Sequence, residues 1–202
     1  MKYFLFSLFF SALLFQSCGN RDLLIDKSLI QDYSDKHPFP GRPYFAHFRN
    51  GDRNLFYIAA FHEKQPSSKT FELITKAFQK HRLDCVIVEG IPFNKGESPK
   101  EVIDLVRRTS KDNSYEYGEA AFTILKATER KIPFYGAEGP AEELKGMLKI
   151  GDQDRYIVDA IEKLVNRYKS VLIVYGSAHL ATQRRALEAA FGKPVLLSEN
   201  IE

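Results

Sequence analysis

Two stretches of this chain are almost entirely hydrophobic, and each ends at a histidine that precedes a helix-like segment. The first runs from Leu55 to His62 (LFYIAAFH), and the second from Val171 to His179 (VLIVYGSAH). A continuous apolar run of this length predicts a strand buried on both faces, as in a parallel sheet covered by helices. Open α/β sheets bind ligands beyond the carboxyl ends of their strands. Both histidines are therefore predicted at a ligand-binding edge.

The rest of the chain alternates between strand and helix patterns. Pro43 to Arg49 and Asn54 to His62 are expected to form an antiparallel hairpin around the turn Asn50-Gly51-Asp52. Further strands are expected at 84–91, 132–138, 171–179 and 194–197, and helices at 67–82, 98–109, 115–131, 140–149, 154–169 and 182–191. This alternation predicts an α/β fold, a single domain with a mostly parallel central sheet flanked by helices and an antiparallel hairpin near its N-terminal end.

The N-terminal segment has a different character. Lys2 is followed by an apolar stretch that is too short to span a bilayer and that ends at the small residue Ser17, which predicts a signal peptide over 1–17. The ending Phe15-Gln16-Ser17-Cys18 resembles a bacterial lipobox, in which the cysteine is acylated. This resemblance implies a lipid anchor on Cys18 and a lipoprotein held at a membrane of the bacterial cell envelope. An ordinary secretory signal and a retained membrane anchor are the alternatives.

Composition sets the remaining limits on the domain. Residues 18–41 are polar and then rich in proline, which predicts a lipidated cysteine on a flexible tether, followed by a domain at 42–202. The net charge of +3 is spread among interspersed acids and bases, so we expect no binding to nucleic acid. The second cysteine, Cys85, lies in an apolar run and is expected to be a buried thiol.

Acids and histidines end four of the expected strands, namely His62, Glu89, Glu138 and His179. In a parallel sheet these ends lie along one edge, so residues far apart in the sequence can converge. Two imidazoles with carboxylates suit a divalent transition metal that keeps an open position for water. Such a metal lowers the pKa of its bound water to about 7, and a spare carboxylate can transfer the proton.

Each of these residues also has a structural interpretation. A histidine at a strand end can simply be hydrogen-bonded, and Glu138 can cap the helix expected after it. Glu89 follows Val86-Ile87-Val88, where a carboxylate is costly to bury unless a cation or several donors meet it. Glu119 either is solvated or belongs to a helix that Gly118 and Ala120 allow to approach another backbone closely.

Several motifs in the same order resemble the TraB/GumN and Tiki superfamily, which has more distant erythromycin-esterase-like and ChaN-like relatives. The family has two G-x-x-H motifs with acids between them. Gly176 to His179 matches the second motif, whereas the first has Ala59 in place of glycine and keeps His62. The intervening segments that carry the resemblance are Val88-Glu89-Gly90, Tyr117-Gly118-Glu119-Ala120-Ala121 and the stretch from Gly136 to Leu144.

This resemblance implies a metal-dependent, peptidase-like hydrolase that acts on a small peptide or ester substrate. His62, His179 and Glu89 are the implied metal ligands, and Glu119 or Glu138 is the implied acid or base beside them. Two alternatives stay open. One is a metal-free esterase-like hydrolase that uses the same histidines. The other is a binding lipoprotein without catalysis, similar to the haem-binding relatives, which is suggested by Ala59 and by a middle region shorter than is usual in the family.

Overall fold

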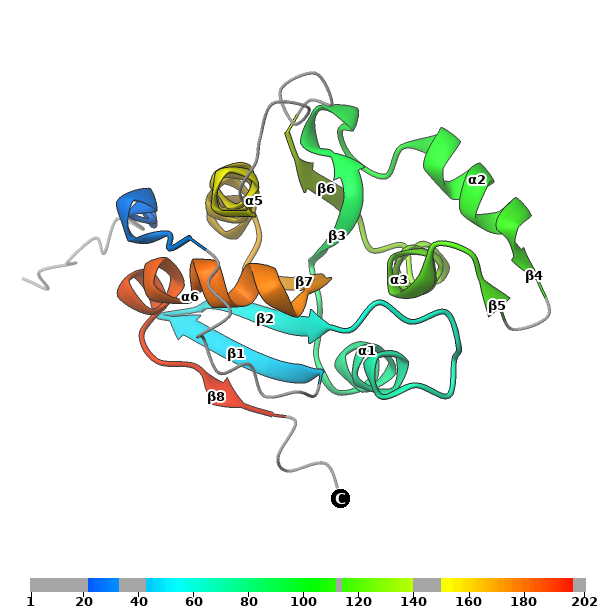
Figure 1. Ribbon diagram of the computed structural model, residues 1–202, viewed down its shortest axis with the longest axis horizontal. Coiled ribbons are helices and arrows are strands. Elements are labelled where there is room, and N and C mark those ends of the chain that lie inside the picture. Colours follow the sequence, from blue (N-terminus) through cyan, green and yellow to red (C-terminus); the bar gives the residue numbers. More distant parts are fainter. Residues whose placement is uncertain (1–21, 33–42, 112–113, 140–149, 198–202) are drawn as a thin grey trace, which may run out of the picture.

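The structure, a computed structural model, describes residues 22–32, 43–111, 114–139 and 150–197. Its centre is a six-stranded sheet with the strand order β6-β3-β7-β2-β1-β8 (Figure 1). The strands of this sheet are β1 (Tyr44–Asn50), β2 (Arg53–Ala60), β3 (Cys85–Pro92), β6 (Phe134–Glu138), β7 (Ser170–Gly176) and β8 (Val195–Leu196). Strands β6, β3, β7 and β2 are parallel, and β1 runs antiparallel to β2 and β8. The expected α/β class, mostly parallel sheet and hairpin are confirmed.

Five α-helices of the described residues surround this sheet. They are α1 (Lys69–Lys80), α2 (Lys100–Thr109), α3 (Gly118–Glu129), α5 (Ile150–Arg167) and α6 (Ser177–Phe191). Short 3-10 turns, η1 (Lys27–Leu29) and η2 (Phe93–Lys95), and a small ribbon of β4 (Ser110–Lys111) with β5 (Ser114–Tyr115) complete the described elements. Helices α5 and α6 cover one face of the sheet, while α1 and α3 cover the other and α2 lies against α3 (Figure 1).

The continuous apolar runs follow from this double covering. In β2, Tyr57 faces the core on the side of α5 and α6, whereas Phe56 and Ile58 face the core on the side of α1 and α3. In β7, Ile173 and Val174 divide between the two cores in the same way. Because both faces are buried, no polar residue is needed at alternate positions. The same covering buries Cys85, which confirms the prediction for its thiol and raises its pKa.

Three expected boundaries at the carboxyl edge are wrong. The strand expected at 171–179 ends at Gly176, and His179 lies in the first turn of α6, which begins at Ser177 rather than at Thr182. Ala60, the last residue of β2, pairs with Gly176, so the chain beyond Gly176 has no strand partner on that side. His62 likewise lies just beyond the end of β2. Both histidines nevertheless remain at the carboxyl edge of the sheet.

Residues 22–32 correct part of the expected tether. Leu23 and Ile25 are buried in the core on the side of α5. Their backbone N–H groups donate to Asn166 Oδ1 at 2.7 Å and to Glu162 Oε2 at 2.6 Å. These two buried side chains fix the segment on the domain. The polar composition of the surrounding residues had predicted a flexible tether instead.

Some expectations fall outside the part of the chain that the structure describes. They are the signal peptide at 1–17, the lipidated Cys18 and the helix expected at 140–149. Among the described helices, none is both long enough and apolar enough to cross a membrane.

Candidate functional site

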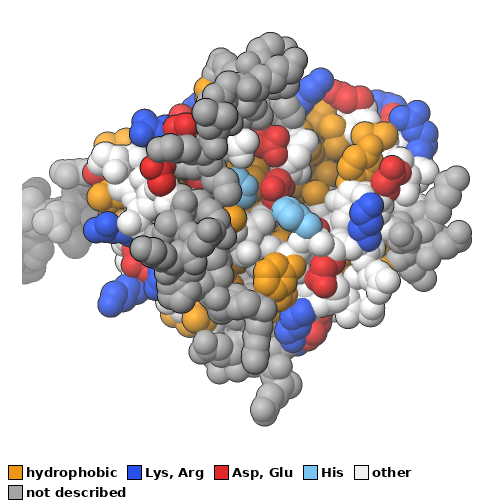
Figure 2. All heavy atoms as spheres, in the orientation of Figure 1, with side chains coloured by type: hydrophobic (Ala, Val, Ile, Leu, Met, Phe, Trp, Pro, Cys, Tyr) orange, Lys and Arg blue, Asp and Glu red, His pale blue; other side chains and the backbone are white. Residues whose placement is uncertain are grey.

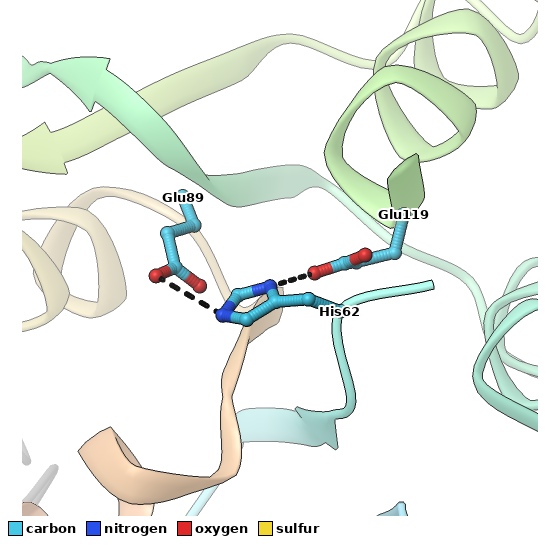
Figure 3. A group of neighbouring side chains, drawn as sticks. All are labelled: His62, Glu89 and Glu119. Atoms are coloured by element: carbon cyan, nitrogen blue, oxygen red, sulfur yellow. Dashed lines mark hydrogen bonds and ion pairs between the residues drawn. The ribbon is translucent and has the colours of Figure 1, made fainter. Parts of the chain in front are cut away.

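The site lies at the carboxyl edge of the parallel strands, where β2, β3 and β7 end beside the first turns of α3 and α6. Figure 3 shows His62 between Glu89 and Glu119, which come from three different parts of the fold. In the space-filling view, histidine side chains lie in the middle of one face beside acidic side chains (Figure 2). The sheet edge therefore brings together His62, Glu89 and His179, which the sequence predicted at strand ends, with Glu119 of α3.

Glu119, in the first turn of α3, holds His62 from one side. Its Oε1 lies 2.6 Å from His62 Nδ1, and its Oε2 accepts the backbone N–H of Glu63 at 3.2 Å. Gly118 makes this approach feasible, because its φ is +54° and a Cβ there would lie 2.6 Å from the carbonyl oxygen of Glu63. The expected close approach of this helix to another backbone is confirmed, and Glu119 is buried rather than solvated.

Asp154 of α5 holds His179 in the same way, and sequence reasoning missed it. Its Oδ1 lies 2.9 Å from His179 Nδ1 and accepts from Gln183 Nε2 at 2.5 Å, and its Oδ2 accepts the hydroxyl of Thr182. Asp154 is fully buried. One signal in the sequence pointed to it: Asp154 stands on the same helical stripe as Ile157 and Ile161, where another hydrophobic residue is expected.

Glu89 lies between the two imidazoles. Its Oε1 is 3.9 Å from His62 Nε2 and 3.6 Å from His179 Nε2. Its Oε2 accepts the backbone N–H of Gly176 at 2.7 Å. A Cβ at Gly176 would lie 3.1 Å from His62 Nε2, so the glycine keeps this meeting point clear. The prediction that Glu89 must face a cation or hydrogen-bond donors is confirmed.

The pKa values show how strongly these groups depend on one another. The hydrogen bond to Glu119 raises the pKa of His62, against the effect of its partial burial. Burial opposes a charge on His179 as well, but its contacts with Asp154 and Glu89 outweigh that effect and raise its pKa to about 9. Burial opposes the charge on Glu89, yet contact with His179 and the N–H of Gly176 keep its pKa below the ordinary value.

A metal ion has suitable ligands here. His62, Glu89 and Glu119 offer ligand atoms that all lie within 4.8 Å of one another. Imidazole nitrogen with carboxylate oxygen suits borderline divalent metals such as zinc. The group can therefore hold a metal ion, as the sequence predicted, but with Glu119 in the place that the prediction gave to His179.

Glu138, the last residue of β6, has a different place from the other acids. Its Oε1 accepts the backbone N–H of Gly90 at 2.7 Å, next to the irregular part of β3 that carries Glu89. Glu138 does line a pocket of about 430 Å³ that also reaches His62, Glu89 and Glu119. The structure thus brings Glu138 to the site without pairing it with either histidine.

Comparisons with family models, with curated proteins and with solved structures find no match for this chain. The resemblance to the TraB/GumN and Tiki superfamily accordingly stays a prediction from five motifs.

Proposed function

We propose that this domain is a metal-dependent hydrolase of the TraB/Tiki type whose metal ligands are His62, His179 and Glu89. One observation carries the proposal. The Nε2 atoms of two histidines, one after β2 and one in α6, face the same Glu89 oxygen at 3.9 and 3.6 Å.

The distance of each Nε2 atom from Glu89 Oε1 supports a shared metal. Zinc bound by tetrahedral nitrogen and oxygen ligands at about 2.0–2.2 Å holds those ligands roughly 3.3–3.6 Å apart. The Nε2 to Oε1 distances of 3.6 and 3.9 Å are a few tenths of an ångström from that range at most. The longer distance involves His62, whose side chain is 69% exposed, so a small rotation of that side chain would close the difference.

The partners of the two Nδ1 atoms favour His179 over Glu119 as the third ligand. Metal-bound histidines commonly donate their other N–H to a carboxylate, which fixes the tautomer and leaves the second nitrogen free for the metal. Glu119 does this for His62, and Asp154 does it for His179. Glu119 then orients a ligand and has no need to be one.

The same arrangement supplies the rest of a hydrolytic site. A metal at this point provides a water of lowered pKa for attack on a carbonyl. Glu138 lines the pocket with only Oε1 hydrogen-bonded among the described residues, so we assign it as the group that accepts and returns the proton. The pocket gives a small peptide or ester substrate access to His62 and Glu89.

One observation favours a metal-free hydrolase as the second candidate. The series Glu119, His62, Glu89, His179 and Asp154 alternates acids with imidazoles of raised pKa, so their charges already compensate one another. In that case the neutral form of His62, oriented by Glu119 and present above the raised pKa of this imidazole, would be the base that activates water. The third candidate is a ligand-binding protein without catalytic activity, which would use the same pocket.

Metal content of the purified protein separates these functions. We expect one equivalent of a divalent transition metal in the wild type after reconstitution and none in the double variant His62→Ala/His179→Ala. His47→Ala, on β1, is the matched control and keeps the metal. Stoichiometric metal in the double variant, or none in the reconstituted wild type, would reject the metal site and favour the alternatives.

Membrane anchoring is part of the same proposal and rests on the lipobox-like sequence at Cys18. Acylation there would hold the hydrolase in the bacterial cell envelope. Cys18→Ser should move the protein from the membrane fraction to the soluble fraction. If the variant stays with the membrane in high salt, lipid anchoring through Cys18 is wrong.

A further inference from the structure

Helix α2 leaves part of its apolar face uncovered. Only Val106 is fully buried, while Val102 and Leu105 are half-buried on the same helix. Both half-buried residues line the pocket beside the histidines. An amphipathic helix normally packs its apolar stripe against the core. Here that stripe is shared between the core and the pocket, so a ligand in the pocket would cover the remainder.

Helix α3 forms the opposite apolar wall. Ala121 and Ile124 line the pocket from α3, and Tyr117, which is 49% exposed, lies at the start of that helix. In Figure 2, hydrophobic side chains stand directly beside the histidine and acidic side chains. The pocket therefore joins an apolar compartment to the groups that we assign to catalysis. Its volume of about 430 Å³ is within the usual range for small-ligand sites.

The charges around the pocket are mostly negative. Among the described residues, Lys64 is the one lysine on its lining, and five glutamates share the lining with it: Glu63, Glu89, Glu116, Glu119 and Glu138. Three of these are engaged with His62, Gly176 or Gly90, but Glu63 Oε2 is buried without a hydrogen-bond partner among the described residues. A buried carboxylate oxygen without a donor is unfavourable. This oxygen has no accessible surface, so it pairs with a cationic donor in the pocket only when the Glu63 side chain rotates toward the pocket that the residue lines.

We propose that the pocket binds a substrate in which an aliphatic chain stands next to an ammonium group, as in the N-terminal aliphatic residue of a peptide. The chain lies between Val102, Leu105 and Ile124, and the ammonium group pairs with Glu63 and Glu116. This inference rests on the proposed hydrolase function, because it places the scissile bond of the substrate beside His62 and Glu89. It also excludes anionic substrates, since the acids outnumber Lys64.

A fluorescent reporter tests this binding without relying on catalysis. The chain contains no tryptophan, so Leu105→Trp places a single indole in the pocket wall. The probes are n-hexylamine, n-propylamine, n-hexanol and hexanoate. We expect saturable fluorescence changes with the affinity order hexylamine, hexanol, hexanoate. Each added methylene from propyl to hexyl should tighten amine binding roughly threefold. Arg108→Trp, exposed on the same helix, is the control and should not respond.

A second variant isolates the ammonium contact. Glu63→Gln should weaken hexylamine binding roughly tenfold and leave hexanol binding unchanged. Calorimetry of hexylamine with the wild-type protein repeats the measurement without the indole. No hexylamine binding by either method, or hexanoate binding as tight as hexylamine, would overturn the inference. Because the probes are not hydrolysed, amine binding by a protein that takes up no metal would reject the metal-dependent hydrolase alone. Stoichiometric metal without amine binding would reject this substrate class alone.

Discussion

The two histidines of the site have the same partners in kind but very different surroundings. Each presents Nδ1 to a buried carboxylate and Nε2 to Glu89. His179 lies in a helix and its side chain is 12% exposed, whereas His62 lies in a loop and is 69% exposed. The carboxylate of Asp154 accepts three hydrogen bonds from side chains, whereas that of Glu119 accepts one from His62 and one from the backbone.

This difference indicates that the two histidines, which lie on either side of Glu89, have different roles. The buried half of the site, His179 with Asp154, is held between α5 and α6 by their hydrogen bond, and neither residue lines the pocket. The exposed half of the site, His62 with Glu119, lines the pocket that a substrate would enter. A rigid ligand on one side and an accessible one on the other let the site keep its geometry while it exchanges substrate and product. The following variants test whether the buried half of the site determines stability while the exposed half determines access.

The largest expected effect is on stability. Asp154→Asn should lower the free energy of unfolding of the metal-free protein by about 3 kcal/mol, because it removes a buried charge that holds His179, Thr182 and Gln183. Glu119→Gln should cost only about 1 kcal/mol, because its imidazole partner is largely solvated. Urea denaturation at pH 7 measures both.

An exposed acid on the same helix serves as the control for Asp154. Asp159 pairs with Lys27, and its side chain is 43% exposed, so Asp159→Asn should change stability by less than about 0.5 kcal/mol. Equal losses for Asp154→Asn and Glu119→Gln would contradict the division between the two halves.

The next effect is a pH dependence that belongs mainly to the buried half. The folded state raises the pKa of His179 from 6.5 to about 9, so the folded protein holds that proton more tightly than the unfolded chain does. This stabilisation is complete below pH 6.5 and is lost as the pH rises to about 9. The metal-free protein should therefore lose on the order of 2 kcal/mol across that interval.

Matched variants assign this slope to one histidine. The pKa of His62 is raised as well, but its exposure reduces the contribution, and the lowered pKa of Glu89 acts only in acid. His179→Gln should flatten the stability profile between pH 6.5 and 9, whereas His62→Gln should preserve most of it. Thermal melts in chelator at half-unit pH steps provide the profile. A wild-type profile that is flat over this interval would show that His179 is not held as a cation.

The sequence predicted the fold well because its signals are local. Continuous apolar runs and the Asn50-Gly51 turn give the strands and the hairpin, and helical spacing gives most helices to within a few residues. The exact start of α6 was not predictable, since Ser177 and Ala178 fit a strand or a helix, and the end of β2 decides between them.

The candidate site was predictable only in part. The two histidines were predicted because both follow hydrophobic runs in the same way, and Glu89 was predicted because a carboxylate after such a run is costly to bury. Glu119 was predicted as an acid of the site, whereas Asp154 was missed. The pairing of each acid with its histidine joins distant segments of the chain, and no local pattern specifies such pairs. The tightly packed Leu23 and Ile25 were missed for the same reason, since their partners lie in α5.

The smallest expected effect concerns the affinity for metal, and it decides what Glu119 does. If Glu119 only orients His62, Glu119→Gln should weaken metal binding by about tenfold, the lower end of the range for groups that position a ligand. Glu116→Gln, an exposed acid on the same pocket, should leave the affinity unchanged. Competition titration with a chromophoric chelator at pH 7.5 measures these values. A complete loss of binding in Glu119→Gln, with His179→Ala still binding metal, would make Glu119 the third ligand in place of His179. That result would move the metal to the exposed half of the site, because His62, Glu89 and Glu119 also lie close enough to share an ion.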